Sequence, residues 1–402
     1  MKILLAATQF YPEFGGIESS IYYIAKTLKE LHHEPVILTG RSRTNLPLYE
    51  NIEGMRVIRY PFLILRNIFS TLRPLCEKKA IDRKLKELLK QEEFGAIWAR
   101  HPFFVCSAIK VGFKGKLIYI PAMVKRIFEE NEILNLKTSL LRKLVITYVM
   151  KLRTSIVEYF ERQALKVADE NIVFSNIVRR MFCDYYKLSK EKIRVIYPGI
   201  DISKFKPNFA DTNLLRKLNI GEKEKIFIYV GRVSRGKNVD LLLEAFSLLK
   251  NTPSVLIIVG MSNELNSLKL LSYKLGISNK VYFVGYQKDT ISYYSIADFF
   301  VMPSTLEGFG HVFLEAMASG LPCIAFKTNY PKVRVATEEI IIDGKNGFLV
   351  DRVNPQSLAE KMLMVLKLSR DEYKRMSEFA HNYAKKFSWR RFINEMGISK
   401  EK

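Results

Sequence analysis

Short apolar runs rich in Ile and Val recur along the whole chain. Each run is followed by turn residues and then by a stretch with helical spacing of its apolar residues. This alternation is typical of parallel strands joined by crossover helices, because a strand that is buried on both faces reads as a continuous apolar run. The sequence therefore predicts an α/β fold. In the first half we expect a doubly wound sheet with strands near residues 2–7, 35–39, 55–59, 95–99, 116–120 and 170–174.

The same alternation of strand and helix patterns starts again in the second half, with apolar runs at residues 226–230, 255–259, 281–284, 299–302 and 322–326. A chain of 402 residues is too long for one ordinary core, so we expect two domains of similar size. Pro and Gly interrupt the pattern at Tyr197-Pro198-Gly199, which places the domains at residues 1–197 and 198–386, followed by a terminal segment, 387–402. Two such units imply a cleft where strand ends from both halves face one ligand.

The chain is strongly basic, with 64 Lys and Arg against 41 Asp and Glu and a formal net charge of +23. Such a charge favours nucleic acids, anionic lipid surfaces and phosphorylated small molecules as partners. The cations are scattered and no RRM, helix-turn-helix or zinc-finger spacing is present, so we expect no nucleic-acid partner. The four cysteines lie far apart without a CxxC pair or zinc-ligand spacing, which predicts a reducing compartment and no structural metal.

The chain has no apolar stretch that predicts a membrane span or a signal peptide. The first apolar run ends at Gln9 and is shorter than a signal peptide requires, and the run 144–150 is far below the roughly 18 residues of a spanning helix. We therefore expect a cytoplasmic protein.

Residues 136–160 differ from the rest of the chain, because apolar residues recur there at helical spacing and no acidic residue occurs between Lys137 and Val157. The cations of this segment are Lys137, Arg142, Lys143, Lys151 and Arg153. The pattern predicts a basic amphipathic helix. Two interpretations remain open: an ordinary packed helix with a solvated face, or a surface that also binds anionic lipid at the cytoplasmic face of a membrane.

The segment from Gly231 to Asn238 lies between a predicted strand and a helical pattern, and it fits G-x-x-x-x-G-K. A nucleoside triphosphatase needs Ser or Thr after the Lys to bind magnesium, and Asn238 stands there instead. Two glycines and the cations Arg232, Arg235 and Lys237 at a strand end still suit a bound diphosphate. Taken alone, the segment is also compatible with solvated loop charges.

A second segment places two carboxylates, Glu307 and Glu315, around a Gly-rich helix start. If the helix begins near Gly310, Glu315 lies about one and a half turns into it and Glu307 lies in the loop before it, so both can face one ligand. The amides of residues 310–312 would then donate to an anion, and the carboxylates would accept hydrogen bonds from a sugar diol. Sugar and phosphate on one molecule describe a nucleotide sugar.

These two segments resemble the retaining GT-B glycosyltransferases of family 4. Residues 307–315 match the E-x7-E motif of that family, and residues 231–237 match its G-R-x4-K segment. Further matches lie at residues 11–18, 33–36, 196–201, 343–350 and 387–389. The resemblance implies the GT-B fold: two Rossmann-like domains facing a central cleft, and a final helix after Trp389 that returns to the first domain.

The resemblance also implies roles for individual residues. Arg232 and Lys237 would neutralise the donor diphosphate, Glu315 would hold the ribose hydroxyls and Glu307 would contact the transferred sugar. The implied donor-binding residues are Gly15, Gly16, Gly199, Arg232, Lys237, Glu307, Gly308, Phe309, Gly310, His311, Val312 and Glu315. His101 stands where relatives often place a His or Arg near the acceptor. We include it with Arg232, Lys237 and Glu307 in the catalytic set, although a lone His at a strand end is about as often structural.

The chain contains no D-x-D motif, which argues against a metal-dependent glycosyltransferase, and the cations already present make a magnesium ion unnecessary. We therefore expect neither a metal nor a cofactor besides the nucleoside-diphosphate-sugar substrate. The predicted reaction is retaining transfer of a sugar to an acceptor hydroxyl of a lipid-linked or cell-surface glycan precursor. The alternative is an epimerase or hydrolase of nucleotide sugars or sugar phosphates on the same fold. A nicotinamide-dependent oxidoreductase would require G-x-G-x-x-G after a strand, and that motif is absent.

Overall fold

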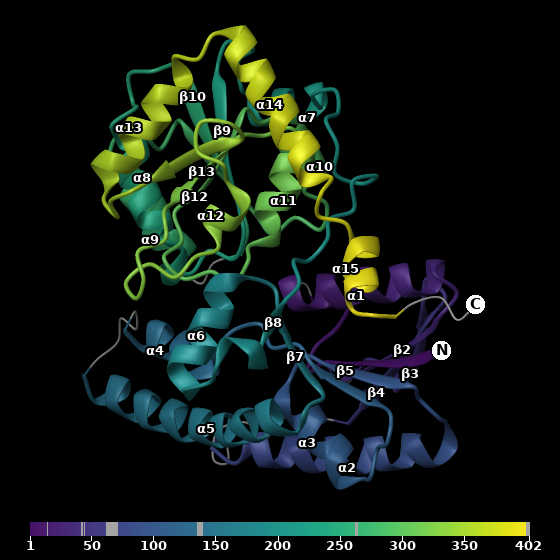
Figure 1. The fold of residues 1–402 in the computed structure, drawn as a ribbon. Coiled ribbons are helices and arrows are strands. Elements are labelled where there is room, and N and C mark those ends of the chain that lie inside the picture. The colour runs from purple at the N-terminus through teal and green to yellow at the C-terminus, as the bar shows by residue number, and fades with distance from the viewer. Residues whose placement is uncertain are drawn as a thin grey trace. The chain divides into compact units, whose positions relative to one another are not determined.

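The computed structural model describes residues 1–13, 15–41, 43, 45–61, 71–134, 140–261 and 264–398. The chain divides into two compact units. Unit 1 comprises Met1–Pro198 and Trp389–Lys402, and unit 2 comprises Gly199–Ser388. The sequence prediction placed these divisions at residues 197 and 386. Each unit consists of a largely parallel sheet with helices packed against it (Figure 1).

The sheet of unit 1 has the strand order β3-β4-β2-β1-β5-β6-β7-β8. Its strands are β1 (Lys2–Ala6), β2 (Glu34–Gly40), β3 (Tyr49–Ile52), β4 (Met55–Tyr60), β5 (Ala96–Ala99), β6 (Lys116–Tyr119), β7 (Glu170–Val173) and β8 (Arg194–Val195). The predicted α/β class and the predicted strands are confirmed. The strands β3 and β8 were not predicted, because they are short and partly exposed and therefore lack a continuous apolar run.

The helices of unit 1 include one from the far end of the chain. They are α1 (Gly16–Glu30), α2 (Arg73–Gln91), α3 (Pro102–Lys110), α4 (Lys125–Leu134), α5 (Leu140–Val167), α6 (Asn176–Tyr186), the short η1 (Lys190–Lys192) and α15 (Trp389–Glu395). In α15 the indole of Trp389 stacks on Tyr23 of α1 with ring centroids 6.2 Å apart, and Phe392 meets Trp98 of β5 edge-on at 6.5 Å. The final helix therefore contributes to the core of unit 1.

The sheet of unit 2 is entirely parallel, with the order β11-β10-β9-β12-β13-β14. Its strands are β9 (Lys225–Val230), β10 (Ser254–Val259), β11 (Val281–Gly285), β12 (Phe299–Met302), β13 (Cys323–Phe326) and β14 (Gly347–Val350). Every predicted strand of this half is present. The strand β14 was not predicted, because it begins at a glycine directly after the turn residues 343–346.

The helices of unit 2 alternate with these strands. They are α7 (Thr212–Leu218), η2 (Arg235–Lys237), α8 (Val239–Ser247), α9 (Leu265–Lys274), α10 (Ile291–Ile296), α11 (His311–Ala318), α12 (Thr337–Ile340), α13 (Pro355–Leu366) and α14 (Arg370–Ala384). Helix α11 begins next to Gly310, as the sequence predicts. It packs against α14, whose first turn is closed by a capping box between Ser369 and Glu372.

Both sheets reverse their strand order beside their first strand. The reversal lies between β1 and β5 in unit 1 and between β9 and β12 in unit 2. Open α/β sheets bind ligands at the carboxyl ends of the strands at this switch point. Directly after these strands come the loop to Gly15, the pair Arg100 and His101, the segment 231–237 and the loop 303–310. The fold thus places most of the predicted site residues at the switch points of the two units.

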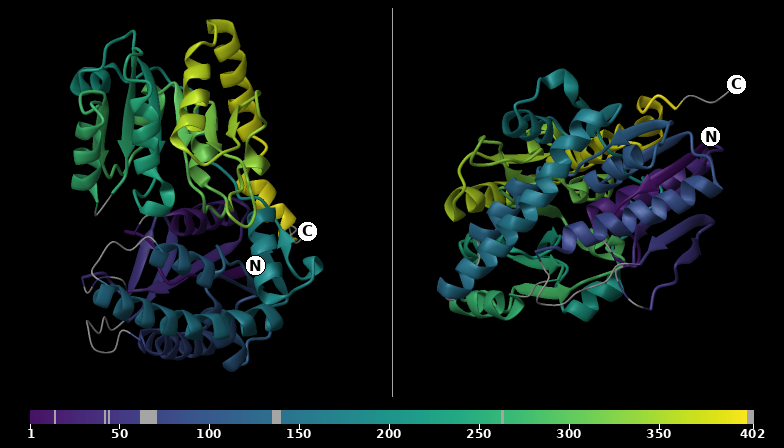
Figure 2. Two further views of the ribbon diagram at one scale, coloured as in Figure 1. Left: turned by 90° about the vertical axis from the view of Figure 1, so that its left-hand side faces the viewer. Right: turned by 90° about the horizontal axis from the view of Figure 1, so that it is seen from below.

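Helix α5 covers most of the predicted amphipathic segment, while residues 135–139, including Lys137, lie outside the described residues. The helix packs against α3, α4 and α2, and Figure 2 shows it as a long helix running across unit 1. Several of its apolar side chains are nevertheless exposed: Leu144, Val145, Tyr148, Leu152 and Tyr159. Of the described helices, none has the length and apolar character that crossing a membrane would require.

Gly260, at the end of β10, allows a close backbone approach to the loop after β9. A Cβ at this position would lie 1.8 Å from the carbonyl oxygen of Gly231, and φ is +153°. A non-glycine residue at such a φ costs about 1–3 kcal/mol, and displacing the neighbouring backbone adds about 1–3 kcal/mol. We expect Gly260→Ala to lower the melting temperature of unit 2, measured by calorimetry, and to lower activity by shifting Gly231.

Gly276→Ala is the matched control for that variant. Gly276 also has a positive φ, +67°, but a Cβ there would meet no atom within 4 Å. We expect it to lower the melting temperature less than Gly260→Ala does. Equal melting temperatures of the two variants would show that the contact between Gly231 and Gly260 does not constrain the loop.

Candidate functional site

The segment after β9 is held by backbone hydrogen bonds to the end of β10. The amide of Gly231 donates to the carbonyl of Val259 at 3.0 Å, and the amide of Val233 donates to that of Met261 at 2.9 Å. The hydroxyl of the buried Tyr229 donates to the carbonyl of Arg232 at 2.9 Å, while the Arg232 residue itself is exposed. The loop therefore has a defined backbone path from which Arg232 reaches solvent.

Asn238, which stands where a nucleoside triphosphatase needs Ser or Thr, has a structural role. Its φ of +52° lies in the left-handed region, which Asn tolerates better than most residues. Its Nδ2 donates to the carbonyl of Pro303 at 2.8 Å and to Oγ1 of Thr305 at 3.4 Å. These bonds join the loop after β9 to the loop after β12, across the switch point of unit 2.

Lys237 and Glu307 form an ion pair between Nζ and Oε2. Both side chains are largely buried, with exposed fractions of 17% and 19%. The amide of Glu307 donates to the carbonyl of Arg334 at 2.9 Å, which fixes the backbone next to the carboxylate. The structure thus brings the Lys of the G-R-x4-K segment and the first Glu of the E-x7-E motif into direct contact.

Helix α11 begins beside this pair. Gly310, the residue before the helix, has φ +81°, and a Cβ there would lie 2.7 Å from the Phe313 ring and 3.2 Å from Cγ of Glu307. Only glycine therefore fits between the carboxylate and the helix. The amides of the first turn, which includes His311 and Val312, form the positive end of the helix dipole.

Glu315 lies inside α11, where its Oε2 accepts a hydrogen bond from the hydroxyl of Tyr294 at 3.0 Å. Burial raises the pKa of Glu315, while the Tyr294 bond and the charge of Lys204 act in the opposite direction. Burial also raises the pKa of Tyr294 well above its usual value, so the phenol stays protonated and remains a donor. Sequence reasoning missed Tyr294, since a Tyr in a short helix carries no motif.

The remaining predicted residues of unit 2 lie in the loop before α11 and at the start of the unit. Phe309 is buried and its ring centroid lies 6.1 Å from that of Phe387, and Gly308 precedes it in the same loop. Gly199 is buried at the first position of unit 2, and the amide of the next residue donates to the carbonyl of Phe387 at 2.9 Å. Phe309 and the residue after Gly199 therefore contact the same residue, Phe387.

In unit 1, Gly15 and Gly16 are exposed at the N-terminus of α1. A Cβ on Gly15 would lie 2.6 Å from Oε2 of Glu18, a buried carboxylate in the first turn. A side chain at position 15 would therefore displace this carboxylate.

His101 is the N-cap of α3, and its Nδ1 accepts a hydrogen bond from the amide of Phe103 at 3.4 Å. Burial, and then the charge of Lys125, lower the pKa of His101 to about 3. The imidazole is therefore neutral near pH 7, and its observed contact is structural. The preceding residue, Arg100, is buried.

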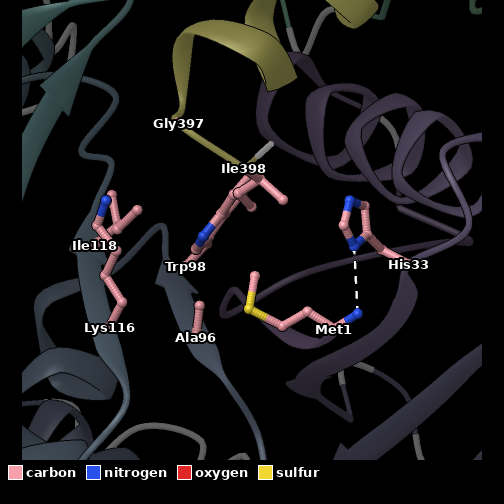
Figure 3. Close-up of a pocket in the computed structure, with 8 residues that line it drawn as sticks. All are labelled: Met1, His33, Ala96, Trp98, Lys116, Ile118, Gly397 and Ile398. Carbon is pink, nitrogen blue, oxygen red and sulfur yellow. Dashed lines mark hydrogen bonds between the residues drawn. The ribbon is translucent and has the colours of Figure 1, made fainter. Parts of the chain in front are cut away.

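Unit 1 contains a cavity of about 250 Å³, and Figure 3 shows the residues that line it. It is lined by Met1, His33, Ala96, Trp98, Lys116, Ile118, Gly397 and Ile398. Ala96 and Lys116 begin β5 and β6, so this cavity lies at the amino edge of the sheet, opposite the predicted site residues. Within the described ranges, no group of three or more His, Cys, Asp or Glu side chains is arranged to hold a metal ion.

Two family models match the chain. The model described as glycosyl transferases group 1 matches residues 211–383, and the model described as glycosyltransferase family 4 matches residues 14–204. The first match contains the E-x7-E and G-R-x4-K segments, and the second contains Gly15, Gly16 and His101.

Curated relatives agree with these models. The chain is 30% identical over 342 residues to the alpha-monoglucosyldiacylglycerol synthase of Streptococcus pneumoniae. The aligned region covers 82% of this chain and 72% of that protein. It is 34% identical over 242 residues to a D-inositol 3-phosphate glycosyltransferase of Corynebacterium urealyticum. That aligned region covers 57% of this chain and 55% of the relative.

Solved structures show the same fold. Sucrose-phosphate synthase from Thermosynechococcus elongatus superposes with a TM-score of 0.79 at 20% identity, covering 98% of this chain and 97% of that one. The Anabaena protein HepE, solved in complex with UDP-glucose, superposes with a TM-score of 0.73 at 20% identity, covering 99% and 98%. The chain therefore belongs to the group 1 glycosyl transferases and is a hexosyltransferase-type enzyme with the GT-B fold.

Proposed function

We propose that this enzyme transfers a sugar from a nucleoside-diphosphate sugar to an acceptor hydroxyl with retention at the anomeric carbon. The observation that carries the proposal is the Lys237–Glu307 ion pair at the switch point of unit 2, next to the N-terminus of α11. The site combines cations and helix amides for a diphosphate with carboxylates for sugar hydroxyls. The solved HepE complex holds UDP-glucose, which supports this donor class.

In the proposed donor complex, Lys237 exchanges one partner for another. In the structure its ammonium pairs with the carboxylate of Glu307. A bound donor offers diphosphate oxygens to Lys237 and to the exposed Arg232, and it offers sugar hydroxyls to the released Glu307. Glu315, oriented by Tyr294, accepts hydrogen bonds from the ribose. Within unit 2, the backbone of residues 308–312 and of Gly199 completes the proposed donor contacts. The donor-binding role of Gly15 and Gly16 in unit 1 stays a prediction.

The proposed reaction breaks the bond between the anomeric carbon and the diphosphate oxygen. The acceptor oxygen forms the new bond on the same face, and its proton goes to an oxygen of the leaving diphosphate. Negative charge develops on that leaving group, so Arg232, Lys237 and the positive end of α11 stabilise the transition state more than the ground state. The mechanism requires neither a metal ion nor a cofactor. His101 takes no proton, because its pKa of about 3 makes it a weak base; it positions the start of α3.

We further propose a lipid-linked acceptor and reversible attachment of unit 1 to the cytoplasmic face of a membrane. The relative named alpha-monoglucosyldiacylglycerol synthase supports a lipid acceptor. At about 100° per residue, Leu144, Tyr148 and Leu152 lie on one side of α5, and their exposed fractions are 59%, 70% and 42%. Lys151 is exposed within this stretch, and Arg162 is exposed further along α5, where it pairs with Glu158 at 3.6 Å. The side chain of Arg142 lies outside the described residues, and Arg153 is partly buried.

We predict that Lys237→Ala and Arg232→Ala each lower the initial rate of sugar transfer at least about tenfold. Each variant removes a charge-assisted contact to the diphosphate worth roughly 1.5–3 kcal/mol. The rates are measured with a panel of nucleotide sugars and acceptors, first identified with the wild-type enzyme.

Lys225→Ala is the matched control, since Lys225 is an exposed lysine of the same unit that pairs with Asp298 away from the switch point. Its rate should equal that of the wild type. Near-normal rates for both Lys237→Ala and Arg232→Ala, with melting temperatures unchanged, would refute the proposed diphosphate site.

Transfer should persist in excess EDTA, because the proposed charge stabilisation comes from Arg232, Lys237 and α11 alone. The measurement compares initial rates in EDTA, in buffer and in buffer with added manganese. A complete loss in EDTA that manganese restores would contradict the metal-independent mechanism.

Wild-type enzyme should cosediment with anionic liposomes at low salt. The triple variant Leu144→Ser, Tyr148→Ser and Leu152→Ser should lose this binding, because it removes the exposed apolar stripe of α5. Lys151→Gln with Arg162→Gln should weaken binding to anionic liposomes selectively, since each cation near an anionic surface contributes about 1 kcal/mol.

A matched control changes two exposed apolar residues elsewhere, Leu270→Ser and Tyr273→Ser in α9. This control should pellet like the wild type. Equal pelleting of the α5 triple variant would mean that α5 does not bind the membrane and would favour a soluble acceptor.

A further inference from the structure

Arg100 occupies the switch point of unit 1. It follows β5 directly, and its amide donates to the carbonyl of Ala6 at 2.8 Å, so its backbone is fixed between β1 and β5. Its exposed fraction is only 7%. The guanidinium carbon lies 4.5 Å from the ring centroid of Phe174, at the end of β7. The ring thus covers one face of the guanidinium and helps to fix its plane.

The hydrogen bonding of this guanidinium is incomplete. Nε and Nη1 of Arg100 are buried, and neither has a hydrogen-bond partner among the described residues. Arg59, the other buried arginine of this sheet, is different: its Nη1 donates to Glu50 at 2.6 Å and its Nη2 donates to the carbonyl of Tyr11 at 2.8 Å. A buried donor without an acceptor costs about 1–3 kcal/mol, and more when it is charged. Within the part of the chain that the structure describes, Arg100 therefore keeps two buried donors that a ligand could satisfy, whereas those of Arg59 are bonded to the protein.

Arg100 remains a cation in this environment. Burial lowers the pKa of Arg100 to about 10, while the carboxylate of Glu18 in α1 favours its charged form. The pKa is still well above neutrality, so the side chain carries its charge under physiological conditions. The neighbouring His101 is neutral, which leaves Arg100 as the charged side chain of this pair.

We propose that Arg100 binds a phosphate group of the acceptor at the switch point of unit 1. The planar guanidinium presents two or more donors in one plane, which suits bidentate contact with phosphate oxygens. The donor diphosphate already has Arg232 and Lys237 in unit 2, so the acceptor is the molecule that supplies the second anion. The identification of this molecule as the acceptor rests on the proposed function, whereas phosphate binding by Arg100 does not. Arg100 then selects phosphorylated acceptors over neutral ones.

Thermal unfolding with inorganic phosphate tests this site directly. The protein is first saturated with whichever of UDP, ADP and GDP raises its melting temperature most, so that the proposed donor site is occupied. Phosphate is then compared with chloride at equal ionic strength. We expect phosphate to raise the melting temperature of the wild type by about 2–4 °C. No shift in the wild type would overturn the proposal.

Three variants test whether Arg100 causes the rise in melting temperature with phosphate. We expect no rise in Arg100→Gln. We also expect none in Arg100→Met, whose apolar side chain keeps the packing on Phe174 and avoids a buried polar group. Arg194→Gln is the control, since Arg194 is an exposed arginine of unit 1 paired with Glu170, and it should keep the full shift. A shift that survives in Arg100→Met would overturn the proposal.

Melting temperatures measured with the nucleoside diphosphate alone distinguish this proposal from the proposed function. The nucleoside diphosphate should still raise the melting temperature of Arg100→Met, but not that of Lys237→Ala. Loss of the nucleotide shift in Arg100→Met would assign Arg100 to the donor diphosphate and would overturn the acceptor assignment. A nucleotide shift that survives in Lys237→Ala would count against the donor site alone, while the phosphate arm would still test Arg100.

Discussion

The ion pair between Lys237 and Glu307 is the interaction on which the proposed donor site depends. It joins two motifs that lie 70 residues apart in the sequence, and it does so in a largely buried position. Each charge neutralises the other, so neither ion is buried alone. A donor molecule that carries both a diphosphate and a sugar can satisfy both groups at once. The two groups that neutralise each other in the structure are thus the two groups that we propose to bind the donor.

Several backbone features hold that pair in place. Asn238 connects the loop after β9 to the loop after β12, and Gly260 allows the end of β10 to approach Gly231. Gly310 leaves room for Glu307 beside the start of α11. Each of these residues has a positive φ. Glycine and asparagine tolerate such φ values, and here they stand in the loops at the switch point of unit 2, where open α/β sheets bind ligands.

Much of this arrangement was predictable from the sequence, because buried parallel strands leave continuous apolar runs and the two motifs have fixed spacing. The strands β3 and β8 were not predictable, since they are short and partly exposed, and β14 was missed because it begins at a glycine directly after turn residues. The role of Tyr294 depends on a tertiary contact with Glu315 and leaves no local pattern. The capping role of His101 and the incomplete hydrogen bonding of Arg100 also emerge only when β5 is placed beside its neighbours.

A crystal structure of the enzyme with an intact nucleotide sugar, compared with a structure without ligand, tests the proposed donor site most directly. We expect Lys237 to leave Glu307 on binding, its Nζ to contact an oxygen of the diphosphate, and Glu307 to accept a hydrogen bond from a sugar hydroxyl. A nucleotide sugar bound elsewhere, with the Lys237–Glu307 pair intact, would contradict it.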